Sequence, residues 1–256
     1  MKGTSLERIF YPLLGLVLVV SLWQLVCILW KMPTAVLPTP LDVAFAIQKN
    51  WVTLFIEGWI TLKASLCGFA LALILGIPLA VGVALFPRLN LMFYPILIAL
   101  QSVPKVALAP ILLVWLGIGI ESKLAIAWLV AFFPIIVDTS AGLQSTPKEL
   151  LELARSLRSS RWQTFIMVQF PAALPFIVTG AKVAVTLAVI GAVIGEFVGS
   201  SEGLGFLLLS ATSQINTALA FASLFALSIM GMLAYLLVVF VEKLLSPWLP
   251  PDNHNH

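Results

Sequence analysis

Charged side chains are scarce in this sequence, and several of them lie inside long apolar runs. Lys105 lies near the middle of the run 91–115, directly after Pro104, and Glu196 lies near the end of the run 172–197. A charge at membrane depth costs about 2.5–3.5 kcal/mol on insertion scales, so each one is expected to serve a function. We expect electrostatic roles for these side chains, and no covalent chemistry in this chain.

The prolines around Lys105 predict a break in its helix. Pro104 precedes it and Pro110 follows, and each proline frees a backbone carbonyl that neighbouring groups or cavity water must satisfy. A broken helix facing a water-filled path would place a positive charge where an anion passes, as in transporters that bind substrate at discontinuous helices. Alternatively, Lys105 pairs with Glu196 or another acid, or its side chain reaches the membrane surface.

Other polar residues within the apolar runs favour structural roles. Lys63 and Lys182 lie near the ends of runs, where a long side chain reaches the membrane surface at low cost. Asp138 could pair with Lys182 across two helices. Cys27 and Cys67 lie far apart without histidine or carboxylate neighbours, which indicates neither a disulfide framework nor a metal site.

A polar segment, residues 144–171, carries the clearest helix signals. Thr146 as N-cap, Pro147 at the first helical position and Glu149 three residues after the cap predict a capping box and a helix start. The residues that then recur at helical spacing are apolar, and they are Leu150, Leu153, Ala154 and Leu157. The segment therefore begins with a short amphipathic helix.

A second short helix is predicted to follow the first. Ser160 can cap it with Gln163 three residues later, and Pro171 is expected to end or bend it. Trp162 is among its apolar contacts. Two such helices at a membrane surface can dock into a groove of a partner protein. The alternative is an amphipathic loop that packs on its own helices or on the lipid surface.

The composition requires a membrane for these segments. The chain is 61% hydrophobic and 10% charged, whereas soluble domains carry roughly a quarter charged residues. Its +3 charge is scattered singly, which argues against nucleic-acid binding. A bilayer core needs about 20 apolar residues of helix. The predicted spans are residues 9–30, 64–86, 91–115, 124–143, 172–197 and 218–241.

The predicted fold is an all-α membrane protein with six spans in a single domain, residues 1–256. Helices are favoured over a barrel because the runs lack alternating polarity. Basic residues collect in one set of loops when the amino terminus is cytoplasmic, so both termini are expected in the cytoplasm. Residues 31–57 are then expected to form a polar external segment. The short tail at 251–256, with His254 and His256, is expected to be disordered.

The segment 144–171 resembles a known motif. Glu152-Leu153-Ala154, Arg158 three residues later and Val168-Gln169-Phe170-Pro171 after nine more resemble the cytoplasmic EAA loop of binding-protein-dependent ABC importer permeases. The pattern of that loop is E-A-A, three residues, G, nine residues, I-x-L-P. Leu153 replaces the first alanine, and Arg158 replaces the glycine. Arg158 could reshape the turn, extend the first helix or contact a partner ATPase.

Further stretches resemble the nitrate/sulfonate/taurine/bicarbonate-type permeases over most of the chain. They are LPTPLDV from Leu37, GFALALILGIPLA from Gly68, SVPKVALAPILLVWLGIGIESK from Ser102, FFPIIVDTSAGL from Phe132 and GAVIGEFVGSSEGLGFLL from Gly191. This resemblance implies a type I ABC importer permease fold in a bacterial inner membrane. It also implies a homodimer with a path along its axis, two ATPase subunits that bind ATP and magnesium, and a binding protein outside.

The resemblance also implies roles for particular residues. Glu196 is expected at a gate or a dimer contact, with a solvated helix end as the alternative, and Pro104 and Lys105 are expected along the path. The residues expected to couple to the ATPase are Glu149, Glu152, Leu153, Ala154, Leu157, Arg158 and Trp162.

The expected cargo is a small anion or a heterocyclic vitamin precursor. No G-x-x-x-x-G-K-[ST] phosphate loop occurs in the chain, so ATP must be used by another polypeptide. Two alternative hypotheses for the function remain. An ion-gradient-driven secondary transporter or channel would need membrane-embedded acids or inverted repeats, and the acids available are only Asp138 and Glu196. A non-transporting scaffold would use residues 144–171 to bind some other partner.

Overall fold

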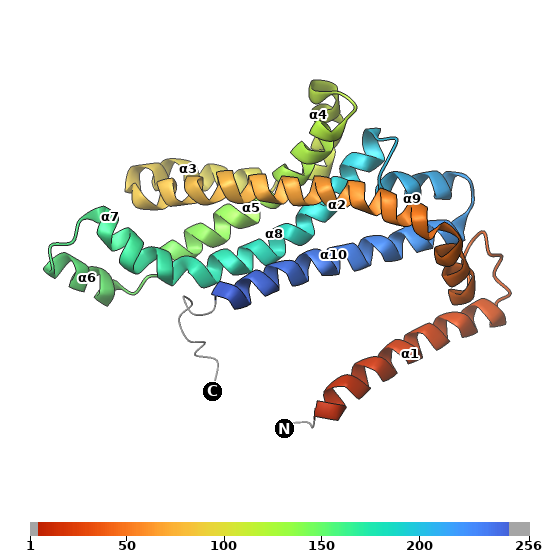
Figure 1. Cartoon of the computed structure of the whole chain (residues 1–256). Coiled ribbons are helices and arrows are strands. Elements are labelled where there is room, and N and C mark those ends of the chain that lie inside the picture. Colours follow the sequence, from red (N-terminus) through yellow and green to blue (C-terminus); the bar gives the residue numbers. More distant parts are fainter. Residues whose placement is uncertain (1–4, 246–256) are drawn as a thin grey trace.

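The described part of the chain, residues 5–245 of a computed structural model, is built from helices, without a strand (Figure 1). Five of them are long and apolar enough to cross a membrane. The predicted all-α membrane fold is therefore confirmed, while His254 and His256 lie outside the described residues. The helices are α1 (Ser5–Leu29), α2 (Pro40–Leu85), α3 (Pro87–Gln101), η1 (Lys105–Leu108), α4 (Ala109–Leu116), α5 (Ile120–Gln144), α6 (Lys148–Ser156), α7 (Arg161–Thr164), η2 (Phe165–Gln169), α8 (Phe170–Gly199), α9 (Leu204–Ser213) and α10 (Thr217–Leu245).

Helix α2 begins much earlier than the sequence predicted. Thr39 caps it: its hydroxyl accepts from the Asp42 backbone N–H, while the Asp42 carboxylate accepts from the Thr39 backbone N–H. Pro40 occupies the first turn, where its missing N–H costs nothing. The interpretation of residues 31–57 as a polar loop is therefore wrong, because a capping box starts a helix that continues, with a kink at Asn50, into the apolar run.

The run 91–115 is not one continuous helix. Helix α3 ends at Gln101, and the chain resumes at Lys105 as a 3-10 turn that leads into α4. Pro104 lies in the break with extended backbone angles, and Gly117, with φ of 82°, ends α4. The predicted break beside Lys105 is confirmed, and the prolines account for it because each removes a backbone donor.

The core of the bundle is a layer of three helices, with α5 packed between α2 and α8. Ala127 of α5 is fully buried between two glycines. A Cβ atom on Gly68 of α2 would lie 2.6 Å from the Ala127 Cβ, and one on Gly191 of α8 would lie 2.7 Å from the Ala127 Cα. Small residues thus let the three backbones approach closely, as is typical of membrane helices.

Helix α10 packs along α2, α8 and α9, whereas α1 extends away from the bundle toward its amino-terminal end (Figure 1). Only the carboxyl-terminal part of α1 is anchored. The Trp23 ring stacks on Phe225 of α10 at 6.2 Å, and in the loop after α1 the Ala35 carbonyl accepts from the Thr217 hydroxyl at 2.6 Å. Most of α1 therefore presents apolar side chains outward, as a helix in lipid does.

Replacing Gly191 with alanine tests the three-helix contact. The added Cβ would overlap the α5 backbone, which cannot move as a flexible side chain can, so we expect Gly191→Ala to lower the free energy of unfolding by about 1–3 kcal/mol. Gly82→Ala is the matched control within a helix, since a Cβ there meets nothing within 4 Å. Unfolding of both variants in mild detergent would be compared. Equal stability of the two would contradict the contact.

Candidate functional site

Two groups of unusual residues lie at opposite ends of the bundle. Helices α6 and α7 protrude beyond one end, and the loop after α8 and helix α9 lie at the other (Figure 1). The break before α4 lies between them, beside the middle of α5. The first group is a surface element with exposed apolar side chains. The second group contains Glu196, whereas Lys105 lies at the break before α4.

Helix α6 starts differently from the prediction. Pro147 is its N-cap and offers no side-chain hydrogen bond. The Thr146 side chain is buried and donates instead to the Leu143 carbonyl at 3.1 Å, at the end of α5. The predicted capping box between Thr146 and Glu149 is therefore wrong, because the end of the preceding helix competes for the threonine hydroxyl.

Arg158 takes the left-handed conformation that the motif normally reserves for glycine. Its φ is 54°, its N–H donates to the Arg155 carbonyl at 2.9 Å, and the Ser159 N–H donates to the Ala154 carbonyl at 3.0 Å. This pair of bonds is a Schellman motif, which ends a helix. Arg158 therefore terminates α6 and turns the chain toward α7, although a side chain in this conformation costs about 1–2 kcal/mol.

Helix α7 begins as predicted and then continues into α8. Ser160 and Gln163 form the capping box, since the serine hydroxyl accepts from the Gln163 N–H at 3.2 Å and the Gln163 carboxamide oxygen accepts from the Ser160 N–H at 2.9 Å. The prediction that Pro171 ends the helix is wrong, while the alternative, a bend at Pro171, stays a prediction. A π-turn, η2, relaxes the hydrogen-bond ladder just before Pro171, so the chain stays helical from Arg161 to Gly199.

The apolar residues of α6 and α7 divide between two faces. Ala154 is buried, at 6% exposed. Leu153 is 56% exposed, Leu157 71% and Trp162 62%, and these three exposed side chains are the outward apolar surface of α6 and α7. Glu149 and Glu152 are exposed on the same helix. The apolar residues that recur at helical spacing in α6 therefore do not share one environment. Ala154 is buried, whereas Leu153 and Leu157 are exposed and available for another contact.

Lys105 lies at a cavity of about 460 Å³ beside the helix break. Its ammonium donates to the Gln101 carbonyl at 3.1 Å, one of the carbonyls freed by the break, and lies 4.8 Å from the centroid of the Phe133 ring. Pro104 and Pro134 also line the cavity. Pairing of Lys105 with Glu196 is wrong, because Glu196 binds other groups.

Glu196 is 1% exposed and holds the start of α9. Its carboxylate accepts from the Thr61 hydroxyl at 2.8 Å and from the Gly205 N–H at 2.7 Å. The Thr61 hydroxyl in turn accepts from the Leu204 N–H at 2.8 Å, and the Glu57 carboxylate accepts from the Gly203 N–H. Three consecutive N–H groups at the α9 amino terminus are thus bound by side chains of α2 and α8, so Glu196 is no solvated helix end.

Sequence reasoning missed Glu57, Thr61 and Lys123 at this end. Lys123 is 2% exposed, and its ammonium lies 3.4 Å from the carboxylate of Glu202. These residues are up to 146 positions from their partners, so no local pattern reveals them. The only available signal was the charge of Glu57 and Lys123 beside apolar runs.

The suggested pair of Asp138 and Lys182 is also wrong. The Lys182 ammonium lies 2.6 Å from the carboxylate of Glu242 on α10. Asp138 instead lies against Gly180 of α8, where an added Cβ would be 2.8 Å from the Asp138 Cβ. The ion pair therefore joins α8 to α10, away from α5.

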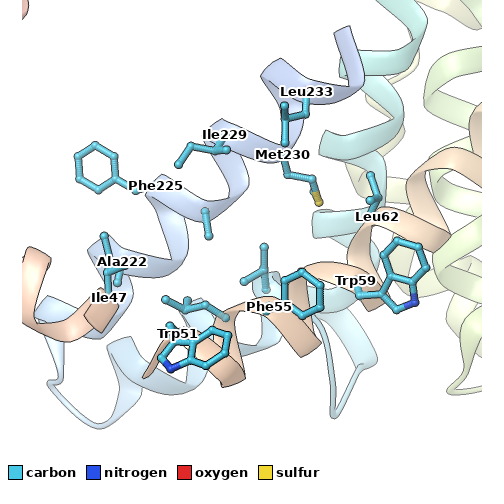
Figure 2. Close-up of a pocket in the computed structure, with 14 residues that line it drawn as sticks. Ile47, Trp51, Phe55, Trp59, Leu62, Ala222, Phe225, Ile229, Met230 and Leu233 are labelled. Atoms are coloured by element: carbon cyan, nitrogen blue, oxygen red, sulfur yellow. The ribbon is translucent and has the colours of Figure 1, made fainter. Parts of the chain in front are cut away.

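The hollow between α2 and α10 has a different character (Figure 2). It has a volume of about 370 Å³ and its labelled lining side chains, among them Trp51, Phe55, Phe225 and Met230, are apolar or aromatic. None of its lining residues is charged. Such a surface suits lipid chains or another helix, and it offers nothing to orient a polar solute.

Comparisons with known proteins show which membrane proteins the chain is similar to. Residues 72–250 match the family described as binding-protein-dependent transport system inner membrane component. The formylaminopyrimidine transport permease protein ThiX of Halalkalibacterium halodurans is 35% identical over 93% of this chain and 95% of its own length. The riboflavin transport system permease protein RibX of Chloroflexus aurantiacus is 37% identical over 95% and 93%.

A solved structure shares the fold. The inward-facing MetNI methionine ABC transporter aligns with a TM-score of 0.67 over 77% of this chain and 97% of the other, at 20% identity. This likeness supports the predicted type I importer permease fold.

Glu196→Ala tests the attachment of α9. The substitution leaves the Gly205 N–H and the Thr61 hydroxyl without their buried acceptor, and an unsatisfied buried group costs about 1–3 kcal/mol. We expect faster amide hydrogen exchange across α9, measured by mass spectrometry. Glu121→Ala is the control, because that carboxylate is exposed. Unchanged exchange in Glu196→Ala would contradict the attachment.

Arg158→Gly tests the turn. Glycine adopts the left-handed conformation without the side-chain penalty, although it also gains freedom in the unfolded chain, so we expect the free energy of unfolding to rise by about 0.5–1 kcal/mol. Thermal unfolding in mild detergent would report the gain. Arg158→Ala should give no such gain, because alanine keeps the Cβ. A loss of stability in Arg158→Gly would mean that the arginine side chain itself stabilises the turn.

Proposed function

Since the chain belongs to the family of binding-protein-dependent transport system inner membrane components, we propose that α6 and α7 receive the motion of partner ATPase subunits. The chain is a multi-pass permease of an ABC importer and not an enzyme. Its own task is then to convert a movement at one end of the bundle into opening and closing of a path. The spans rock around that path by alternating access.

The outward apolar surface of Leu153, Leu157 and Trp162 carries this proposal. Burial of apolar surface contributes about 25 cal/mol per Å², and large side chains at the centre of a contact supply most of its affinity. Glu149 and Glu152 beside that surface fix the orientation of a partner through their charge. The alternative, a loop packed on its own bundle, fits the burial of Ala154 but leaves the side chains of Leu153, Leu157 and Trp162 more than half exposed.

The path of the motion follows from the covalent continuity of α7 and α8. The capping box at Ser160 fixes the start of α7, and the chain stays helical over 39 residues to Gly199. Phe165 anchors this helix in an apolar cluster with Leu143 of α5 and Ile177 of α8. A push on Leu157 and Trp162 therefore moves α8, and α8 carries α5 with it through their close packing.

Two ATPase subunits bind the ATP and magnesium in this proposal. A second copy of the permease forms a homodimer with the path along its axis, and an extracytoplasmic binding protein delivers the cargo. Helices α6 and α7 then lie in the cytoplasm, as do both termini, and the chain lies in a bacterial inner membrane. The scattered basic residues around α6, α7 and the end of α10 support this orientation.

Lys105 and Pro104 line the path in this scheme. The cavity beside them combines a cation, freed carbonyls and the Phe133 ring, which suits a solute with an anionic or polar edge and a flat apolar face. Glu196 acts at the gate by holding α9 against α2 and α8. The names of the relatives ThiX and RibX favour a heterocyclic vitamin or its precursor as cargo over a small inorganic anion.

Glu152→Arg tests the coupling surface. The permease would be co-expressed with its neighbouring genes, purified as a complex and reconstituted in liposomes. We expect a co-purified ATPase in the wild type and, in Glu152→Arg, at least tenfold less ATP-driven uptake of a formylaminopyrimidine or riboflavin probe. Reversal of a charge that orients a partner costs several kcal/mol, enough for such a loss.

Leu157→Asp should have the same effect by placing a charge in the apolar contact. Lys148→Gln is the control, since it changes an exposed charge at the other end of α6. If the chain purifies without an ATPase and Glu152→Arg keeps full activity, the coupling role is wrong. The secondary-transporter and scaffold hypotheses would then be favoured.

A further inference from the structure

We propose that a phosphate group binds in the polar cavity between α6, α7 and the end of α2. The cavity has a volume of about 480 Å³. Arg155 from the last turn of α6 and Arg161 from the first turn of α7 both line it. Ser159, Thr164 and Gln169 supply the neighbouring hydroxyl and amide groups.

Among residues 5–245, the two guanidinium groups have no ion-pair partner. The ion pairs within residues 5–245 join Lys123 to Glu202 and Lys182 to Glu242, and neither involves an arginine. Glu149 and Glu152 lie on the same helix as Arg155 but form no ion pair with it. Two cations held at one cavity repel each other, so an anion between them is favourable. A guanidinium fork also matches the oxygens of a phosphate in two bonds at once.

The polar neighbours complete the donor set. The Ser159 hydroxyl and the Gln169 carboxamide make no hydrogen bond with other described residues, and both are only half-buried. The Thr164 hydroxyl donates to the Ser160 carbonyl at 3.1 Å. Two cations with two free donors are suited to an acceptor-only ligand, and a phosphate presents three or more acceptor oxygens.

The cavity is separate from the surface proposed for the ATPase. Leu151 and Arg155 are four residues apart and share the flank of α6 that faces the bundle, whereas Leu153 and Leu157 share the outward face. Phosphate binding therefore does not depend on the coupling role. A bound phosphate would bridge α6 and α7 across the turn at Arg158 and hold the two helices at one angle.

The floor of the cavity indicates where the phosphate comes from. Ala84 and Leu85 form it, at the end of a helix long and apolar enough to cross a membrane. The headgroups of phospholipids lie at this level of a membrane protein. A phospholipid headgroup and free phosphate share the required chemistry, and the experiment separates these two sources.

The test compares two charge-matched double variants of the full chain in detergent micelles. Arg155→Gln with Arg161→Gln removes the site, and Lys148→Gln with Lys243→Gln removes two exposed cations elsewhere. Retention of phosphatidylglycerol would be measured by native mass spectrometry, and binding of inorganic phosphate by calorimetry. We expect the arginine variant to bind the favoured probe at least tenfold more weakly than the wild type, and the lysine variant to stay within about twofold.

Each outcome decides between the sources or against the site. Loss of phosphatidylglycerol alone assigns a lipid headgroup, and loss of phosphate alone assigns a soluble ligand. An equal loss in both variants would overturn the proposal, because general surface charge would then explain the binding, as would failure of the wild type to bind either probe. The pair Arg155→Lys with Arg161→Lys keeps the charge without the forks and should bind at an intermediate level, which guards against a folding defect in the glutamine variant.

Discussion

The close contact of three backbones, with Ala127 of α5 between Gly68 of α2 and Gly191 of α8, is the constraint on which the rest of the structure depends. In lipid the apolar side chains gain nothing by leaving the surrounding medium, so helices associate through tight packing and polar bonds. The two glycines supply the tight packing. Because α5 and α8 cannot slide past each other without a clash, they move as one body, and both ends of the bundle are placed relative to that body.

The two ends of the bundle use polar bonds in different ways. At the α9 end, Glu57, Thr61 and Glu196 satisfy backbone donors that would otherwise be buried without partners. At the α6 end, the Schellman turn and the Ser160 capping box satisfy the backbone locally, and the exposed side chains are left over. One end is therefore closed on itself, and the other is open to partners. This difference fits a permease whose energy source lies outside its own chain.

Local patterns predicted much of this architecture, and long-range contacts account for what they missed. Apolar runs of sufficient length gave the all-α fold, and the spacing around Ser160 and the prolines at Lys105 gave a capped helix and a break, because these signals act within a few residues. The sequence does not reveal the start of α2, because polar residues within its first turns resemble those of a loop. The Thr146 hydroxyl donates to a carbonyl at the end of α5 and does not cap α6. The partners of Glu196 and Lys182 come from distant helices, which no spacing rule identifies.

The π-turn between α7 and α8 has a mechanical consequence. Its defining bond runs from the Phe170 N–H to the Phe165 carbonyl, five residues back, so this turn holds one residue more than its neighbours. One extra residue rotates everything before it by about 100° around the helix axis. A helix with such a turn can twist at that point by exchanging one hydrogen-bond register for another, without breaking. The continuous helix from α7 to α8, which joins the exposed apolar surface to the bundle, thus contains a point of easy twisting. Such a helix transmits a push along its axis better than a rotation about its axis.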